Sequence, residues 1–226
     1  MAREFTDKRL RALDAAQWHA ACPNLAILAF RDGDAIYHQG VRSDAVYYLV
    51  SGHVKLSVVG AEGTERTIAI LGSGELLGPG ISGPKEMLAA ETAYAKGDVQ
   101  VYRFPRHDLV ELVISHATHA QAVLDLLARR HYVAVRRLNA LHFKTAEARV
   151  AEALLDLIRN DGGFCGHGYQ LEIPLTQQEL AELASASRPV VSTILNRLRK
   201  QGVLSYTRTF ICIDDMDALA RISESA

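Results

Sequence analysis

The chain has 226 residues, with 25 Lys and Arg against 26 Asp and Glu and a formal net charge of −1. This length suggests one or two domains, and a composition of 49% hydrophobic and 23% charged residues excludes general disorder. No apolar run approaches the roughly 20 residues of a membrane-spanning helix, and the charged N-terminus excludes a secretion signal. We therefore expect a cytoplasmic protein.

Three scattered cysteines, Cys22, Cys165 and Cys212, exclude a disulfide framework and a CxxC zinc or redox motif. The first 20 or so residues favour a short helix around Leu10 and Trp18. From Leu25 to about Pro105 short β-rich runs alternate with glycine-containing turns, which indicates an all-β unit. The predicted strands are residues 35–37, 45–50, 53–59, 67–71, 92–96 and 99–104, with turns that include Ser51-Gly52 and Gly97-Asp98.

Residues 108–141 contain no glycine or proline, and their apolar residues recur at helical spacing. The pattern predicts one helix about 50 Å long, at 1.5 Å per residue. Such a helix buries its apolar stripe against a partner, most simply a second copy of itself, although packing on its own domain remains the alternative. We expect Val123, Leu127, Val135 and Leu138 at this dimer interface.

The C-terminal part predicts an amphipathic helix at residues 146–159, a short hairpin and then two close helices. The first of these two opens with a capping box, in which Thr176 and Glu179 satisfy each other's backbone amides. Ser187 is the N-cap of the second, which has Pro189 in its first turn. A buried stripe of Val191, Ile194, Leu195 and Leu198 and a final hairpin of residues 203–206 and 210–213 complete the motif.

The opposite face of the second helix suits the DNA major groove, where Arg reads guanine and Asn reads adenine. Residues 185–208 hold five basic side chains and no acid, the local excess that phosphate binding requires. A solvated helical hairpin with an incidental basic face is the alternative. We expect Arg188 to read a base and Arg199 and Lys200 to supply general electrostatics. The expected DNA contacts are Thr176, Gln178, Ser187, Arg188, Pro189, Ser192, Thr193, Asn196, Arg199 and Lys200.

Residues 33–40 and 43–56, together with Leu175–Ala181, Ser187-Arg188 and Ile194–Leu198, are similar to motifs of one family. The chain resembles the regulators related to the cyclic-AMP receptor protein and the fumarate–nitrate regulator. This resemblance implies an α+β fold with a jelly-roll-like β-roll of the cyclic-nucleotide-binding type, a long dimerisation helix and a winged helix-turn-helix. The expected boundaries are 1–107, 108–142 and 143–226. The expected function is that of a homodimeric transcription regulator bound to pseudo-palindromic double-stranded DNA, with RNA polymerase as a further candidate partner.

The resemblance also implies an effector pocket that differs from a cyclic-AMP pocket. Gly74-Glu75 matches the ribose-binding pair, but Glu91 precedes Thr92-Ala93 where an arginine is expected to hold the phosphate. The hydroxyls that read adenine are replaced by Ala134-Val135. A different register of the loop would instead place Lys85 near the phosphate. We therefore expect a small-molecule effector other than cyclic AMP, in a pocket of Gly74, Glu75, Leu76, Glu91, Thr92, Ala93, His131, Ala134 and Val135.

Two alternatives stay open at this stage. A haem-based gas or redox sensor of the same family would use a helix histidine as axial ligand, from among His116, His119, His131 and His142. A ligand-binding module whose C-terminal unit contacts proteins is the alternative from a different class. No nucleophile motif, metal motif or carboxylate pair with telling spacing occurs, so we expect neither catalysis nor a metal centre.

Overall fold

A computed structural model of the chain describes residues 25–43, 45–78, 88–165, 168–171, 173–207 and 210–225. These residues form two compact units that divide within one helix, between Tyr132 and Val133, with residues 66–68 grouped in the second unit. The helix predicted around Leu10 and Trp18 lies outside the described residues. None of the described helices is long and apolar enough to cross a membrane.

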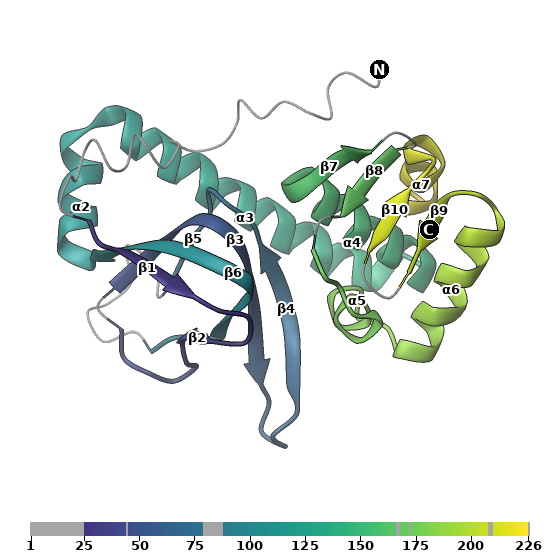
Figure 1. Ribbon diagram of the computed structural model, residues 1–226, viewed down its shortest axis with the longest axis horizontal. Coiled ribbons are helices and arrows are strands. Elements are labelled where there is room, and N and C mark those ends of the chain that lie inside the picture. The colour runs from purple at the N-terminus through teal and green to yellow at the C-terminus, as the bar shows by residue number, and fades with distance from the viewer. Residues whose placement is uncertain are drawn as a thin grey trace. The chain divides into compact units, whose positions relative to one another are not determined.

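The first unit is built on a β-roll whose two longest strands form its central pair (Figure 1). The strand order is β1-β6-β3-β4, with β2 added to β6 and β5 added to β3. Strand β6 runs antiparallel to β1, β2 and β3. The strands are β1 (Ile27–Phe30), β2 (Ala35–Tyr37), β3 (Ala45–Val59), β4 (Glu65–Leu71), β5 (Leu76–Leu77) and β6 (Thr92–Pro105).

Strands β3 and β6 each join two segments that we predicted as separate strands. The turns expected at Gly52 and Gly97 are wrong, because the ladder continues through both positions with shifts of register. Gly52 has φ +85°, and a Cβ added there would lie 2.3 Å from the carbonyl oxygen of Asp98. The two strands therefore bend together at a point where only glycine allows so close an approach.

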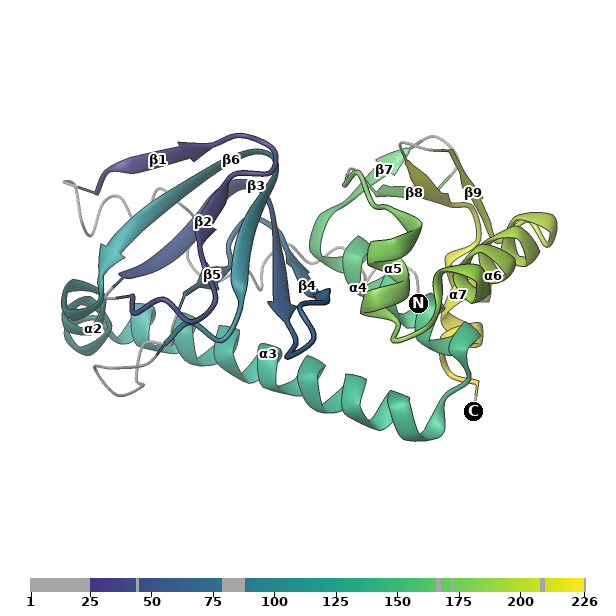
Figure 2. The same cartoon turned by 90° about the horizontal axis from the view of Figure 1, so that it is seen from below.

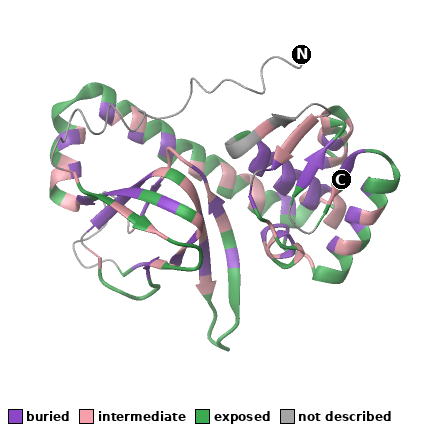
Figure 3. Cartoon of the chain, viewed as in Figure 1, coloured by how far each residue is buried: buried purple, intermediate pink, exposed green. Residues whose placement is uncertain are grey.

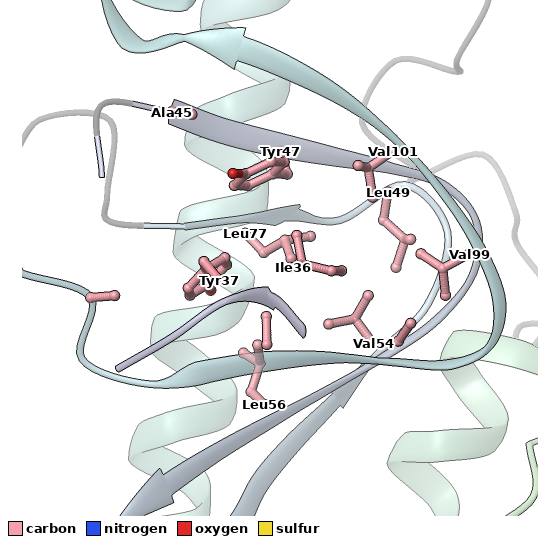
Figure 4. Close-up of a cluster of buried hydrophobic side chains, with 13 residues drawn as sticks. Ile36, Tyr37, Ala45, Tyr47, Leu49, Val54, Leu56, Leu77, Val99 and Val101 are labelled. Carbon is pink, nitrogen blue, oxygen red and sulfur yellow. The ribbon is translucent and has the colours of Figure 1, made fainter. Parts of the chain in front are cut away.

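The interior of the roll is filled by side chains from β2, β3, β5 and β6 (Figure 4). The rings of Tyr37 and Tyr47 stack with centroids 5.9 Å apart, and Leu49 and Val101 are fully buried. Apolar and polar residues alternate along a strand where one of its faces is exposed, and apolar residues run continuously where both faces are covered. Figure 3 shows buried residues on these strands, mixed with exposed ones, and also on the helices of the second unit.

The long helix predicted at residues 108–141 is interrupted. Helix α2 (Arg106–Ser115) ends before His116, which has the extended dihedral angles φ −131° and ψ 107°, and α3 (Ala117–Phe143) follows. The Ser115 hydroxyl donates to the carbonyls of Glu111 at 2.7 Å and Leu112 at 3.3 Å. A serine side chain that bonds the preceding turn in this way competes with continuation of the helix, a signal that apolar periodicity does not register.

Helix α3, the long helix labelled in Figure 2, buries one stripe of residues and exposes another. Val123 and Leu126 pack into a second cluster of the β-roll unit with Phe104 and Leu109. Val123 is 4% exposed within its own chain, so its expected place at a dimer interface is wrong. The exposed apolar residues of α3 include Leu124, Leu127, Val135, Leu138 and Leu141.

The second unit joins a helical bundle to a four-stranded sheet of order β7-β8-β10-β9. Its final helix was not predicted, although Asp215 caps it by accepting a hydrogen bond from the Ala218 amide at 2.8 Å. The elements are α4 (Ala146–Asp161), β7 (Gly162–Cys165), β8 (Gly168–Leu171), α5 (Gln177–Leu183), α6 (Arg188–Lys200), β9 (Leu204–Tyr206), β10 (Ile211–Ile213) and α7 (Met216–Ser223).

Buried ion pairs connect the end of α3 to α4 within the second unit. Arg136 lies 2.8 Å from the Glu152 carboxylate and also pairs with Asp156. Lys144 lies 3.0 Å from the other oxygen of Glu152 and donates to the Ser223 carbonyl at 2.8 Å. Because carboxylates buried this deeply need charged partners, these contacts fix the junction between the two helices.

Candidate nucleic-acid interface and effector site

The helix-turn-helix forms as its local signals predict. The Thr176 hydroxyl accepts from the Glu179 amide at 3.1 Å, and the Glu179 carboxylate accepts from the Thr176 amide at 2.8 Å, which confirms the capping box. Ser187 is the N-cap residue of α6, although its side chain makes no capping hydrogen bond. The predicted stripe of Val191, Ile194, Leu195 and Leu198 is buried.

The turn between α5 and α6 is held by a residue that sequence reasoning missed. Ser185 adopts φ +49°, an unusual conformation for a residue other than glycine. The guanidinium of Arg149, on α4, donates to the carbonyls of Ala184 at 2.9 Å and Ser185 at 3.1 Å. It also donates to the Lys144 carbonyl at 2.8 Å. Arg149 lies 35 residues before the turn, so no local pattern could reveal this contact.

Three of the ten predicted DNA-binding residues line one groove of the second unit. Thr176 and Gln178 of α5, Arg188 at the start of α6, and Tyr206 and Thr207 after it line this groove. Its floor includes Leu180 and Leu195. The two helices and the wing hairpin β9–β10 therefore surround a single concave surface that carries a cation.

The exposed face of α6 carries Arg188, Pro189, Thr193 and Lys200. The Thr193 hydroxyl donates to the Pro189 carbonyl at 3.0 Å and keeps its capacity to accept. Arg197, which we counted in the basic cluster, instead pairs with Glu147 of α4. Arg208 lies outside the described residues. The basic character of this face therefore depends on Arg188, Arg199 and Lys200.

Asn196, which we expected to read adenine, makes its hydrogen bonds inside the domain. Its Oδ1 accepts from the Tyr206 hydroxyl at 3.1 Å and from the Arg199 guanidinium at 3.1 Å. Its Nδ2 donates to the Ser192 carbonyl at 2.9 Å. Reading adenine requires both Oδ1 and Nδ2 of an asparagine, so Asn196 would have to release its bonds from Tyr206 and Arg199 to take that role.

In the β-roll, the carboxylate of Glu91 is bound by a tyrosine. The Tyr37 hydroxyl donates to Glu91 Oε1 at 2.8 Å and accepts from the Gly78 amide at 3.1 Å. Burial and then the negative charge of Glu91 raise the pKa of Tyr37 well above its usual value, while the nearby Arg130 opposes this shift. The phenol is therefore fixed as a donor to Glu91.

Glu75 faces helix α3. Its carboxylate lies 2.9 Å from the guanidinium of Arg130, which also donates to the Leu76 carbonyl. The expected contact of Glu75 with a ribose stays a prediction, because a carboxylate that is paired with one arginine can still accept a further hydrogen bond. Gly78, four residues after Gly74, is the glycine whose amide contacts Tyr37 beside Glu91.

The residues expected to form one effector pocket fall into separate groups. Leu76 belongs to the cluster that packs under α2 and α3, whereas Ala93 belongs to the interior of the roll. Thr92 is buried, and its hydroxyl accepts from the Gln39 amide at 3.0 Å. The remaining expected residues of α3, His131, Ala134 and Val135, are exposed on the helix surface. Lys85 lies outside the described residues.

The histidines considered for haem lie in different settings. His116 and His119 flank the break between α2 and α3, with ring centroids 5.2 Å apart. His119 is buried, and burial together with His116 lowers its pKa below the usual value. His131 and His142 are exposed. In the part of the chain that the structure describes, no group of three or more His, Cys, Asp and Glu side chains could hold a metal ion.

Comparison with known proteins agrees with this arrangement. A cyclic nucleotide-binding domain model matches residues 27–116, and a Crp-like helix-turn-helix domain model matches residues 148–222. A cyclic AMP receptor protein from Thermus thermophilus is 36% identical over 178 residues, which cover 77% of each protein. A CRP-like cAMP-activated global transcriptional regulator from Mycobacterium tuberculosis is 28% identical over 193 residues, covering 85% of each.

Solved structures show the same fold. FixK2 from Bradyrhizobium japonicum superposes with a TM-score of 0.76 at 23% identity, covering 89% of this chain and 98% of that one. A CRP/FNR-family transcriptional regulator from Thermus thermophilus gives a TM-score of 0.70 at 25% identity, covering 88% of this chain and 99% of that one. These matches confirm the predicted α+β fold.

A β-roll of the cyclic nucleotide-binding type followed by a long helix and a winged helix-turn-helix is the arrangement of a DNA-binding transcription regulator. The relatives are regulators and not enzymes, in line with the absence of a catalytic motif from the sequence. The chain belongs to the CRP/FNR family of transcription regulators.

Proposed function

We propose that the protein is a homodimer that binds a pseudo-palindromic DNA site and regulates transcription under the control of an effector bound at the β-roll. The groove that collects Thr176, Gln178 and Arg188 beside the wing is the observation that carries the DNA-binding role. An exposed arginine at the N-terminal end of a recognition helix can reach guanine O6 and N7 in the major groove. RNA polymerase is the further partner that this regulatory role favours.

The exposed stripe of α3 supports the homodimer. Leu124, Leu127, His131, Ala134, Leu138 and Leu141 are spaced by alternating steps of three and four residues, the a and d positions of a coiled coil. Leu124 is 66% exposed and Leu138 is 60% exposed in the single chain. A second copy of the same helix has the same spacing and covers this stripe by knobs-into-holes packing.

The effector that we propose is a small molecule other than cyclic AMP. A phosphate placed beside Glu91 would meet a like charge. Arg130, whose charge partly opposes the rise in the pKa of Tyr37, is already bound to Glu75 and to the Leu76 carbonyl. The exposed Ala134 and Val135 of α3 offer no hydroxyl to an adenine base. Both curated relatives described above carry cyclic AMP in their names. Glu91, Ala134 and Val135 are the residues at which this chain departs from the expected cyclic-AMP pocket.

Selection of binding sites from random DNA tests the proposal. Purified protein should enrich a pseudo-palindrome with half-sites about one helical turn apart, and native mass spectrometry of the complex should give two protein chains per duplex. The same spectrum, with an absorbance scan, would identify a co-purified small molecule or haem. Enrichment of no sequence, or a complex that contains one chain, would contradict the proposal.

A further inference from the structure

The side-chain amide of Asn196 connects the recognition helix to the wing. Asn196 lies on α6, and its Oδ1 accepts hydrogen bonds from Tyr206 of β9 and from Arg199, one turn further along α6. The amide orientation is determined by these partners, because an arginine can only donate and the Ser192 carbonyl can only accept. Both lone pairs of Oδ1 and one hydrogen of Nδ2 are therefore in use.

A second contact, with the ring of Tyr206, restrains the side chain of Arg199. Its guanidinium carbon lies 5.3 Å from the centre of the Tyr206 ring, within range of a cation–π contact. A guanidinium has five N–H donors, and the bond to Asn196 Oδ1 uses one Nη2 donor. Arg199 is exposed, so its other donors can bind an external acceptor. Because a free arginine side chain loses rotamer entropy on binding, a side chain that is already held loses less.

We propose that Asn196 is a positioning residue that holds Arg199 and the wing tyrosine Tyr206 in place for the DNA backbone, and that it does not read a base. The proposal rests on the proposed DNA-binding function. Arg199 lies one turn beyond Asn196, near the C-terminal end of α6, where a long cation suits a phosphate. Through Asn196 the wing strand and the end of the recognition helix present their groups to the duplex as one unit.

The test measures DNA affinity of the full chain for the selected site and for a random duplex at several salt concentrations. Asn196→Ala should weaken binding to both duplexes by a similar factor, about 3- to 10-fold, with no change of preferred base at any position. Arg199→Ala should weaken both and lower the slope of log affinity against log salt by about one. In an Arg199→Ala background, Asn196→Ala should have little further effect.

Two further variants separate positioning from folding. Tyr206→Phe removes the hydrogen bond and keeps the ring under Arg199, so it should produce a smaller loss with an unchanged melting temperature. Asn196→Gln keeps both functional groups of the amide on a longer side chain and should restore part of the affinity lost in Asn196→Ala. These measurements are made only on variants whose circular dichroism and dimer mass equal those of the wild type.

Three outcomes would overturn the proposal. Relaxed preference at one base pair of each half-site in Asn196→Ala would show that this side chain reads a base. Additive losses in the Asn196→Ala/Arg199→Ala pair would show that Asn196 does not act through Arg199. An Asn196→Ala variant with wild-type affinity and salt slope would leave it no role in binding. Failure of the proposed function is distinguishable, because the wild-type protein itself would then select no DNA site.

Discussion

Arg130 of α3 and Glu75, which precedes β5, form an ion pair with 2.9 Å between guanidinium and carboxylate. Glu75 is 18% exposed and Arg130 is 35% exposed, so the pair is partly shielded from water. Arg130 also binds the Leu76 carbonyl, and its charge partly opposes the rise in the pKa of Tyr37, the residue that donates to Glu91. One acidic side chain of the β-roll, Glu75, is thus connected to α3 through the Arg130 guanidinium.

Removing one partner of this pair should cost stability, and removing both should cost less. Arg130→Met leaves Glu75 charged without its cation, and we expect a loss of about 1–2 kcal/mol because the site is only partly buried. The double variant Glu75→Gln/Arg130→Met removes the unpaired charge and should recover part of that loss. Urea denaturation measures the unfolding free energy of the single and the double variant. A double variant that is less stable than the single one would argue against this account of the pair.

Charged substitutions in the exposed stripe of α3 should produce monomers. Leu127→Glu and Leu138→Glu each place a carboxylate where a coiled-coil seam excludes water, and light scattering should report half the wild-type mass. Tyr132→Glu is the matched control, because Tyr132 is 65% exposed on the same helix but lies outside the a and d positions. If the Leu variants stay dimeric, the interface lies elsewhere.

Arg188→Ala should lower sequence preference. We expect a loss of roughly 1–3 kcal/mol on the selected site and relaxed preference at one base pair of each half-site. Lys200→Ala, an exposed cation at the other end of α6, is the control, and it should weaken specific and random DNA alike. Equal losses on both DNAs for Arg188→Ala would remove its base-reading role.

Isothermal titration with cyclic AMP should show binding at least about 100-fold weaker than in a pocket with a phosphate-binding arginine, since each 1.4 kcal/mol is tenfold. Glu91→Gln removes the like charge and should strengthen binding. Lys85→Ala is the control for the alternative register of the loop. Micromolar binding by the wild type that also raises DNA affinity would overturn this prediction.

Acidification should destabilise the protein partly through His119. Burial and His116 lower the pKa of His119 in the folded chain, so the unfolded chain takes up this proton at higher pH. The stabilising contribution of the neutral ring is complete above a pH of about 6.5 and declines as the pH falls toward the folded-state value. His119→Gln should flatten the fall in unfolding free energy as the pH drops below about 6.5. His142→Gln, at an exposed position of the same helix, is the control, and an equal effect of both variants would contradict this assignment.

Local signals predicted the parts of the fold that depend on neighbours in the chain. The capping box at Thr176 and the buried stripe of α6 follow from spacing within one or two helical turns, and both are present. The merger of strands at Gly52 was not predictable, because it depends on the Asp98 carbonyl across the sheet. A glycine that permits close approach of two strands looks the same in sequence as a glycine in a turn.

The candidate sites also contain features that local spacing predicts and features that depend on residues far apart in the chain. Arg188 was placed on the exposed face of α6 by helical period alone. The hydrogen bond that Asn196 accepts depends on the wing, which brings Tyr206 back to α6. The ion pair of Glu75 depends on α3, which brings Arg130 to the start of β5. Such partners are separated by 10 and 55 residues, and no periodic pattern connects them.

The three carbonyls bound by Arg149 limit how this DNA-binding motif can be transplanted. A fragment that contains only α5, the turn and α6 would lack the guanidinium that holds Ala184 and Ser185. The left-handed backbone conformation of Ser185 would then lose these hydrogen bonds, and serine by itself disfavours that conformation. A chimaeric regulator that borrows this recognition helix therefore needs the whole segment from Lys144 onward, because the turn before the helix is held by Arg149 of α4.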